Sequence, residues 1–319
     1  MKTVLITGGC GHIGSKLIRE LANRDDVKKV IIYDNMSCER YCSLFNLPQN
    51  IEYEFIQGDI LDKENLNKAM KNCDIVIHLA AITNATESFE IKDKVELVNF
   101  KGTENVVDCA IENKIKKLIY PSTTSVYGPI DGLAKEDCKE DDLKPQSPYA
   151  ETKLKGENIV LEKAKQNNLN ATVFRFGTIF GTSPGMRFHT AVNKFCFLAC
   201  NNLPLTVWDK AQEQKRPYLD LNDAIRAMFF AIDNEETKNE LFNVVTKNLT
   251  VNDMVNSIRE FIPDLKITIT QSPLLNQQSY VTDDSKIRAL GFSYTGDLKK
   301  SIGETIELLK INKIYKNSF

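Results

Sequence analysis

The stretch VLITGGCGHIG occupies residues 4–14, and the stretch SKLIREL follows it at residues 15–21. The first four residues are β-branched or apolar, as in a buried strand, and the apolar residues of the second stretch recur with the period of a helix. The glycines between them allow a tight turn and let a ligand approach the backbone with no Cβ in the way. A helix N-terminus attracts phosphates through its free N–H groups and its dipole. Together the strand, turn and helix predict a pyrophosphate site.

A carboxylate follows the next apolar run. Residues 30–33 read VIIY, and Asp34 lies 20 residues beyond Gly14. This spacing is typical of the acid that binds the adenosine ribose hydroxyls of a dinucleotide. Because a carboxylate would repel a 2′-phosphate, the sequence favours NAD over NADP as the cofactor.

Composition excludes several classes of function. The chain has 319 residues, enough for one large domain or two lobes, and a net charge of −2. Such a charge gives no electrostatic case for binding nucleic acid or an anionic membrane. No apolar run approaches the ~20 residues of a membrane span, and no signal peptide is recognisable, so we expect a cytoplasmic protein without a membrane partner. Eight scattered cysteines without a C-x-x-C, and only three histidines, predict reduced, mostly buried thiols and no metal site.

The order of the predicted elements indicates the fold. Strands are expected near residues 3–7, 29–33, 52–57, 74–79, 116–121 and 170–175, and helices near 12–23, 62–71, 90–113 and 147–168. This alternation predicts an α/β protein with a Rossmann-type doubly wound parallel sheet. Beyond residue 176 the pattern loosens, with helices expected near 187–201, 222–232, 250–261 and 297–311. We therefore expect an NAD-binding domain at 1–176 and a smaller α/β lobe for the substrate at 177–319, interleaved with the sheet.

Two polar residues near strand ends have a local interpretation beside a functional one. Asp59 follows the strand at 52–57, where it would accept from an adenine amino group or cap the next helix, and its spacing does not decide between the two. His78 lies within the apolar run 75–81, so we interpret it as a packed core histidine and not as a base.

The residues that carry chemistry lie between Ser122 and Lys153. The hydroxyl run Ser122-Thr123-Thr124-Ser125 ends a strand, where it suits either sugar hydroxyls or a turn. Tyr149 and Lys153 stand four residues apart and share one helix face. A neighbouring ammonium lowers the pKa of a tyrosine toward working pH, so the phenol can serve as a general base or acid. Beside a dinucleotide motif, the pair favours catalysis over a surface contact.

These motifs resemble the extended short-chain dehydrogenase/reductases, and within them the NAD-dependent nucleotide-sugar epimerases and dehydratases. Asn99 with Gly102-Thr103, the run 285–292 and the run RPYLDLNDA at 216–224 add to the resemblance, which covers essentially the whole chain. It implies a nucleotide-sugar substrate and a homodimer formed through the helices near 90–113 and 147–168.

The resemblance also implies roles for single residues. Tyr149 would be the base, Lys153 would tune it and bind the ribose, and Thr123, three positions before Val-Tyr-Gly, would bind the reacting sugar oxygen. The other residues expected to contact NAD are Gly8, Gly11, His12, Ile13, Gly14, Asp34, Asn35, Ser37, Asp59, Ile60, Leu79, Ala80, Ala81, Asn99, Ser122, Phe176 and Gly177. Those expected to contact the substrate are Thr83, Thr124, Ser125, Thr178, Arg187, Asn193 and Arg216.

Positions 124 and 125 distinguish members of the family. The 4,6-dehydratases carry an Asp-Glu pair after the catalytic threonine, the uronic-acid decarboxylases a glutamate before Val-Tyr-Gly, and the 3,5-epimerase/reductases a cysteine there. This chain has Thr124 and Ser125. Neutral hydroxyls match the UDP-glucose 4-epimerase-like enzymes best. We therefore expect a nucleotide-sugar epimerase acting at C4 of a hexose through a transient 4-keto sugar.

The chain also departs from the 4-epimerase pattern. Thr178 replaces their usual asparagine, and residues 273–279 lack their Arg-x-Gly-Asp. The run GTSPGMR at 181–187 resembles an atypical branch that includes 4-dehydrogenases of GDP-linked sugars. Arg187 and Arg216 would clamp the diphosphate, unless Arg187 is simply a solvated residue at a helix start. A 4-dehydrogenase/reductase, a dehydratase and an inactive NAD-binding regulator remain as alternatives, and the sequence leaves the nucleotide open among UDP, GDP, CDP and dTDP.

Overall fold

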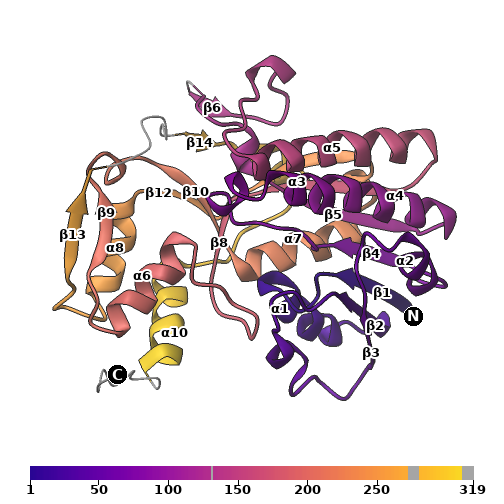
Figure 1. Ribbon diagram of the computed structural model, residues 1–319, viewed down its shortest axis with the longest axis horizontal. Helices are drawn as coiled ribbons and strands as arrows, with labels where there is room; N and C mark the ends of the chain where they lie inside the picture. The colour runs from indigo at the N-terminus through magenta and orange to yellow at the C-terminus, as the bar shows by residue number, and fades with distance from the viewer. Residues whose placement is uncertain (131, 272–279, 311–319) are drawn as a thin grey trace.

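Seven strands form the central sheet, in the order β11-β7-β5-β4-β1-β2-β3. Figure 1 labels β1 to β5 of this sheet. The structure is a computed structural model that describes residues 1–130, 132–271 and 280–310. Every neighbouring pair of these strands is parallel. The strands are β1 (Lys2–Thr7), β2 (Val27–Asp34), β3 (Glu52–Gln57), β4 (Ile75–His78), β5 (Lys117–Thr123), β7 (Ala171–Phe176) and β11 (Glu240–Val244). The predicted Rossmann-type fold is confirmed.

Helices cover both faces of the sheet because its strands are apolar on both sides. Val4 and Ile6 of β1 belong to one apolar core, and Leu5 between them belongs to the other, as the alternation of side chains along a strand requires. The first core is closed by α1 (His12–Glu20) and α7 (Leu221–Asp233). The second is closed by α2 (Lys63–Ala69), α4 (Gly102–Glu112) and α5 (Pro148–Gln166).

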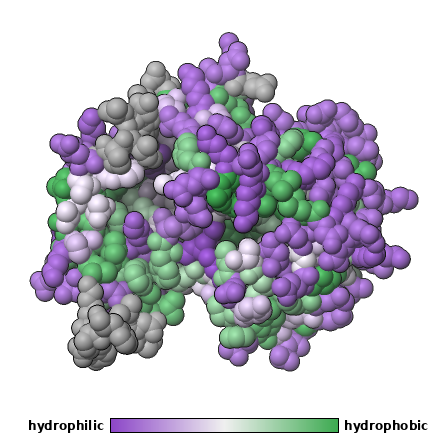
Figure 2. All heavy atoms as spheres, viewed as in Figure 1, coloured by the Kyte–Doolittle hydropathy of each residue, from purple (hydrophilic) through white to green (hydrophobic). Residues whose placement is uncertain are grey.

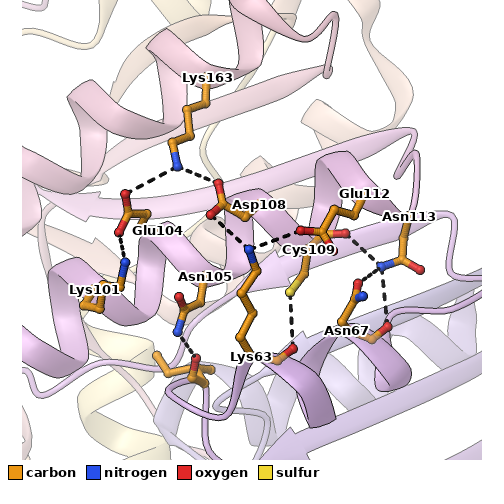
Figure 3. Close-up of polar contacts among 11 residues, drawn as sticks. Lys63, Asn67, Lys101, Glu104, Asn105, Asp108, Cys109, Glu112, Asn113 and Lys163 are labelled. Atoms are coloured by element: carbon orange, nitrogen blue, oxygen red, sulfur yellow. Dashed lines mark hydrogen bonds and ion pairs between the residues drawn. The ribbon is translucent and has the colours of Figure 1, made fainter.

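Ion pairs join the helices of the second face to one another. Figure 3 shows Lys163 of α5 reaching Glu104 and Asp108 of α4, at 3.5 and 2.5 Å. Lys63 of α2 reaches Asp108 and Glu112 of α4, at 3.3 and 3.1 Å. The contacts of Lys163 lie on the part of α5 that is remote from its first turn.

A smaller part of the molecule packs beside the sheet and has its own apolar core. That core includes Phe180, Cys196, Leu205, Met254 and Ile302. Its helices are α6 (Ala191–Cys200), α8 (Val251–Arg259) and α10 (Leu298–Lys310). Its strands are β8 (Thr178–Phe180), β10 (Arg216–Asp220) and β12 (Lys247–Leu249) in one sheet and β9 (Leu205–Trp208) with β13 (Ile267–Thr270) in another. Figure 2 shows the surface hollowed between this part and the sheet-bearing part, with polar groups in the hollow.

Two short elements of the C-terminal region complete the described chain. The strand β14 (Val281–Thr282) pairs with β6 (Leu133–Ala134), which lies in the connection between β5 and α5. The helix α9 (Ser285–Ala289) follows β14 and packs against β11. The C-terminal region is thereby attached to the sheet-bearing part at the strand ends.

The structure differs from the sequence-based expectation in several places. The strand β11 and the helix α7 belong to the central sheet layer although they lie beyond residue 176. The expected helix at 187–201 begins only at Ala191. The expected helix at 90–113 consists of α3 (Lys92–Val95), a π-helical turn (Glu96–Lys101) and α4. The end of the helix expected at 297–311 and the run 273–279 lie outside the described residues.

Over the ranges that the structure describes, no helix combines the length and the apolar character needed to cross a lipid bilayer. The eight cysteines, all within these ranges, are free. Four of them are buried, two are half-buried and two, Cys38 and Cys42, are exposed. Nor do the described His, Cys, Asp and Glu side chains include a group of three that could hold a metal ion.

Candidate active site

The glycine-rich turn connects β1 to α1. Gly8 has a φ of +69°, and a Cβ there would lie 2.6 Å from the Ala80 nitrogen. A Cβ on Gly14 would lie 2.6 Å from the Gly8 carbonyl oxygen. The N-cap residue Gly11 has no side chain to cap α1, and the first turn carries no acidic residue. The turn is therefore shaped for close approach of an anion, with the helix N-terminus free of a competing carboxylate.

Asp34 ties the end of β2 to this turn. One carboxylate oxygen accepts from the Cys10 nitrogen at 3.0 Å and the other from the Met36 nitrogen at 2.9 Å. The neighbouring Asn35 donates to Asp59 at 2.9 Å. The capping function considered for Asp59 belongs to Asp62, whose carboxylate accepts from the Asn65 nitrogen at the start of α2. Asp34, Asn35 and Asp59 thus lie together at the carboxyl ends of β2 and β3, where an adenosine would lie.

His12 and His78 are both built into the fold. The His12 ring nitrogen Nε2 pairs with the Gly181 carbonyl at 2.9 Å, and burial lowers its pKa to about 4. His78 lies between the hydroxyls of Thr7 and Thr103, at 2.7 and 2.9 Å, and burial lowers its pKa to about 3. The interpretation of His78 as a packed core histidine is confirmed.

Asn99 and Asn193 use their amides to hold backbone. The Asn99 amide accepts from the Ile82 nitrogen at 2.7 Å and donates to the Ile82 carbonyl at 2.8 Å, which fixes the segment after β4. Asn193 accepts from the Gly181 nitrogen at 3.3 Å and donates to the Arg187 carbonyl at 3.1 Å. Both residues therefore shape the site through the segments that they hold, and direct contact with a ligand stays a prediction.

Tyr149 and Lys153 occupy the first two turns of α5. The helix starts here because Ser147 accepts from the Ala150 nitrogen as N-cap and Pro148 follows at the first helical position. Burial raises the pKa of the half-buried Tyr149, and this rise is opposed by a hydrogen bond with Thr123 and by the charge of Arg187. Thr123 at the end of β5, Tyr149 and Arg187 thus converge.

The Lys153 ammonium is directed at β5. Its Nζ donates to the Pro121 carbonyl at 2.7 Å and lies 4.5 Å from the centre of the Tyr120 ring. Burial lowers the pKa of Lys153 to about 7, and the Glu157 carboxylate opposes this shift. Glu157 accepts from the Ser122 hydroxyl at 2.5 Å, so the Ser122 side chain contacts the buried face of α5.

Tyr280 is a site residue that sequence reasoning missed. Its hydroxyl donates to the Thr124 hydroxyl at 3.4 Å, and the Arg216 guanidinium lies 5.5 Å from the centre of its ring. Burial raises the pKa of Tyr280. Thr124 and Arg216, which are both expected to bind the substrate, therefore both contact the side chain of Tyr280. No local pattern around residue 280 signals this contact.

Arg187 lies in the segment between β8 and α6 and does not start a helix. Its Nε is buried and has no hydrogen-bond partner within the described chain. Burial lowers the pKa of Arg187, and Arg40 lowers it further, whereas Tyr149 opposes both effects. The structure thus places Arg187 beside Arg40 and Tyr149, and Arg216 beside Tyr280, so the two arginines expected to form one clamp have different neighbours.

The segment that carries Arg187 packs against the glycine-rich turn. The Ser183 hydroxyl donates to the His12 carbonyl at 2.8 Å, and the Gly185 nitrogen donates to the Ser15 hydroxyl at 2.9 Å. The Cys42 thiol, from the connection after β2, donates to the Pro184 carbonyl at 3.3 Å. These contacts bring the segments that carry Arg40 and Arg187 to the same end of α1.

The remaining predicted residues also follow strand ends. They are Gly11, Ile13 and Gly14 at the start of α1, the exposed Ser37 after β2, the buried Ile60 after β3, Leu79, Ala80, Ala81 and Thr83 after β4, the exposed Ser125 after β5, the buried Phe176 and Gly177 at the end of β7, and the exposed Thr178 in β8. The Thr83 hydroxyl oxygen is buried without a hydrogen-bond partner in the described chain. In open α/β sheets this edge is where ligands bind.

The residues present fit a dinucleotide. The glycine-rich turn and the uncapped start of α1 suit a pyrophosphate, Asp34 suits the adenosine ribose, and small residues after β4 leave the strand ends accessible. When bound, NAD supplies a hydride acceptor at this edge of the sheet.

Comparison with known proteins agrees with this geometry. The model of the NAD dependent epimerase/dehydratase family matches residues 4–244. The human dTDP-D-glucose 4,6-dehydratase is 30% identical over 325 residues, covering 98% of this chain and 91% of the relative. A trifunctional UDP-glucose 4,6-dehydratase, 3,5-epimerase and reductase of Arabidopsis thaliana is 28% identical over 318 residues, and the chain spans 47% of its length.

Solved structures share the fold. The UDP-glucuronic acid 4-epimerase from Bacillus cereus, in complex with UDP-glucuronic acid and NAD, superposes with a TM-score of 0.84 and 25% identity, covering 97% of this chain and 99% of that one. An epimerase of Methanothermobacter thermautotrophicus superposes with a TM-score of 0.85 and 26% identity, covering 98% and 93% of the two chains.

Proposed function

The chain belongs to the NAD dependent epimerase/dehydratase family, whose members are extended short-chain dehydrogenase/reductases, and we propose that within it the protein interconverts two nucleotide sugars that differ at C4 of a hexose. The family and its use of NAD are the premise of this proposal. The proposal itself concerns which of the family's reactions the chain catalyses.

The observation that carries the proposal is that the two residues after Thr123 are uncharged. The two residues after Thr123 are Thr124, which is buried against the Tyr280 hydroxyl, and the exposed Ser125. Removal of water across C5 and C6 needs an acid and a base besides Tyr149, and a decarboxylase of the family carries a glutamate at position 125. A 4-epimerase needs neither, because it has only to oxidise C4 and reduce it again from the other face.

The chain's own residues divide the work. Tyr149 takes the proton of the C4 hydroxyl, and Thr123 hydrogen-bonds the same oxygen as it becomes a carbonyl of the 4-keto sugar. The Lys153 ammonium stabilises the negative charge on Tyr149 and binds the ribose of the cofactor. After the keto sugar rotates, Tyr149 returns the proton to the C4 oxygen.

We propose that arginines hold the diphosphate of the substrate. Arg216 at the start of β10 would bind it near Tyr280, and Arg187 would reach it from the segment above α1, since guanidinium groups suit phosphate oxygens. We further propose a homodimer formed through α4, α5 and the segment before α4, where Phe89 is 51% and Leu97 is 50% exposed. Figure 2 shows apolar groups among polar ones in the middle of the view, over α3.

A 4,6-dehydratase is the second candidate, and the sequence relatives favour it. The human relative at 30% identity is a dehydratase of dTDP-D-glucose, and the Arabidopsis relative also carries a UDP-glucose 4,6-dehydratase activity. For this chain the candidate would require Tyr280 or another group to replace the carboxylates that the dehydratases carry after their threonine.

One experiment separates the candidates. The purified protein is incubated with UDP-, GDP-, CDP- and dTDP-hexoses in turn, without added cofactor, while proton NMR follows the sugar and absorbance at 340 nm follows NADH. We expect a C4 epimer without net NADH for one nucleotide. A 6-deoxy-4-keto sugar would support the dehydratase, and a keto sugar with matching NADH would support a 4-dehydrogenase. NAD binding without turnover of any substrate would contradict all three.

A further inference from the structure

Lys153 is surrounded by groups that fix its position but compensate little of its charge. The Pro121 carbonyl and the Tyr120 ring contact it from β5. The side chain is 5% exposed, so water does little to solvate the ammonium. The mechanism proposed above needs that ammonium, and the contacts from β5 alone do not explain how it stays protonated.

A buried carboxylate lies one helical turn farther along α5. Glu157 and Lys153 stand four residues apart on the face of α5 that packs on the sheet, and both are buried. Glu157 is held in turn by Arg175 of β7, whose Nε lies 3.1 Å from both carboxylate oxygens and whose Nη2 lies 2.8 Å from one. The Ser122 hydroxyl donates to the same carboxylate at 2.5 Å.

Lys153, Glu157 and Arg175 thus form a row of buried charged groups. Side-chain exposure is 5% for Arg175 and 1% for Glu157, so the ion pair is shielded from solvent and from salt. Arg175 is itself placed by the Tyr127 ring, 4.7 Å from its guanidinium carbon. The carboxylate is therefore oriented by Arg175 on one side, while its field reaches Lys153 on the other.

We propose that Glu157, oriented by Arg175 and Ser122, is a positioning residue that keeps Lys153 in its ammonium form. The proposal rests on the proposed function for its catalytic consequence, but the protonation of Lys153 is a property of the chain alone. Glu157 does not touch the reacting atoms. It acts through Lys153, and through Lys153 on Tyr149.

Other charged and titratable groups face this region from each packed element. Tyr120 of β5 lies under the ammonium, His78 of β4 stacks on Tyr120 with ring centres 5.6 Å apart, and Tyr149 precedes Lys153 on α5. Arg175 of β7 and Tyr127 lie behind Glu157, and Arg187 lies beside Tyr149. The phenols and the histidine are neutral at neutral pH, and burial keeps the His78 pKa at about 3. Glu157 is thus the anion among these groups that can favour the protonated lysine.

The direct test measures the Lys153 titration in the full chain. The protein is prepared with ¹³C-labelled lysine, and the Lys153 Cε resonance, identified by its absence in Lys153→Met, is followed against pH. We expect Glu157→Gln to lower the pKa of Lys153 by about one unit or more. Asp108→Asn, which removes a carboxylate from the ion pairs of Figure 3 at the other end of α5, should leave it unchanged. An unchanged Lys153 titration in folded Glu157→Gln overturns the proposal.

A second variant covers the case in which Glu157→Gln does not fold, because removing one partner of a buried ion pair is destabilising. Glu157→Gln combined with Arg175→Gln leaves no unpaired buried charge, and because the Glu157 carboxylate is the charge that raises the pKa of Lys153, we expect that pKa to fall in the same direction. No fall, or a rise, overturns the proposal.

A kinetic test applies once a substrate is known. Because the lysine works as an ammonium, a lower pKa removes the active form at lower pH. The alkaline limb of the kcat profile should therefore move to lower pH in Glu157→Gln, with little change in KM. One pH unit above the new midpoint, kcat of the variant should be about tenfold below its own plateau value. A limb that stays in place in an active variant contradicts the proposal, whereas a wild-type protein without turnover leaves the NMR result to decide.

Discussion

Thr123 and Tyr149 come from the end of a central strand and the first turn of a helix, so their relative position is set by the packing of α5 on β5. Gly156 allows this packing, since a Cβ there would lie 2.2 Å from the Tyr120 hydroxyl oxygen. A side chain at position 156 would displace α5 and with it Tyr149. The proton-transfer pair is therefore positioned by rigid elements and not by a loop.

Replacing Tyr149 with phenylalanine should abolish catalysis while leaving cofactor binding intact. The phenyl ring fills the same space but cannot take a proton, so we expect turnover to fall by about 10²–10⁴-fold. Steady-state kinetics on the substrate found by NMR measure the loss, and calorimetric titration with NAD serves as the control. Activity near that of the wild type would contradict the role of Tyr149 as base.

The two buried histidines predict a loss of stability in weak acid. An unfolded histidine titrates near ~6.5, whereas burial lowers the pKa of His12 to about 4 and that of His78 to about 3. Between these values the unfolded chain binds more protons than the folded chain, so the free energy of unfolding falls as pH falls. From pH 7 to pH 5 we expect a loss of about 2 kcal/mol for each histidine.

Chemical denaturation at the two pH values measures this loss. His78→Gln removes one group with a lowered pKa, so the difference between pH 7 and pH 5 should shrink by about 2 kcal/mol, whatever the variant's absolute stability. A difference as large as that of the wild type would show that His78 does not cause the acid loss.

At the scale of elements, the segment 181–187 and the glycine-rich turn form one structure. A Cβ on Gly185 would lie 2.5 Å from the Cys10 carbonyl oxygen and 2.6 Å from that of Gly11. Because the obstructing atoms are backbone, the turn itself would have to move. We expect Gly185→Ala to weaken NAD binding by at least about tenfold, about 1.4 kcal/mol. Pro184→Ala, at the exposed neighbouring position, is the control.

Calorimetry with NAD measures both variants. If Gly185→Ala binds NAD as tightly as Pro184→Ala does, the segment 181–187 is not part of the cofactor site. Thermal unfolding of the two variants without ligand shows whether the effect is confined to binding.

The elements that sequence reasoning predicted are those with local signals. The glycines of 8–14, Asp34, and the pair Tyr149 and Lys153 are each recognisable within one strand–turn–helix unit or one helix face. The strand β11 carries no such signal, because its partner β7 lies far back in the chain. The contact of Tyr280 with Thr124 spans 156 positions.

For polar side chains, the sequence does not distinguish a ligand contact from a contact within the fold. Asn99 and Asn193 have the residue type of a ligand contact, yet their amides hold backbone in the structure. An asparagine that binds a ligand and one that binds a loop look alike in a sequence. The same applies to Ser122, which was predicted to contact NAD and donates to the buried Glu157.

For the whole molecule, two aspartates at the start of α7 connect the sheet-bearing part to α10. Asp220 caps α7 through the Asn222 nitrogen at 2.8 Å and accepts from the Ser301 hydroxyl of α10 at 2.5 Å. Asp223 accepts from the Thr246 hydroxyl at 2.7 Å and from the Thr295 and Gly296 nitrogens at 2.8 and 3.0 Å. The division of the chain at residue 176 stays a prediction, and these contacts show that the parts on either side of it are interleaved.

Replacing Asp223 with alanine should therefore loosen the two parts of the molecule. It leaves two backbone donors and a hydroxyl without their buried acceptor, at a cost of about 3 kcal/mol or more in the free energy of unfolding. The strand β10, which carries Arg216, runs directly into α7. In the variant we expect a raised KM for the nucleotide sugar and an unchanged affinity for NAD, because most of the predicted NAD contacts lie at the carboxyl ends of the strands β1 to β4, away from α7. Urea unfolding measures the stability, steady-state kinetics measure the KM, and calorimetric titration measures the NAD affinity. The control is Asp253→Asn, which alters a helix cap in α8 away from this junction. A loss of NAD affinity as large as the rise in KM would mean that the junction supports both sites and that the two parts act as one rigid unit.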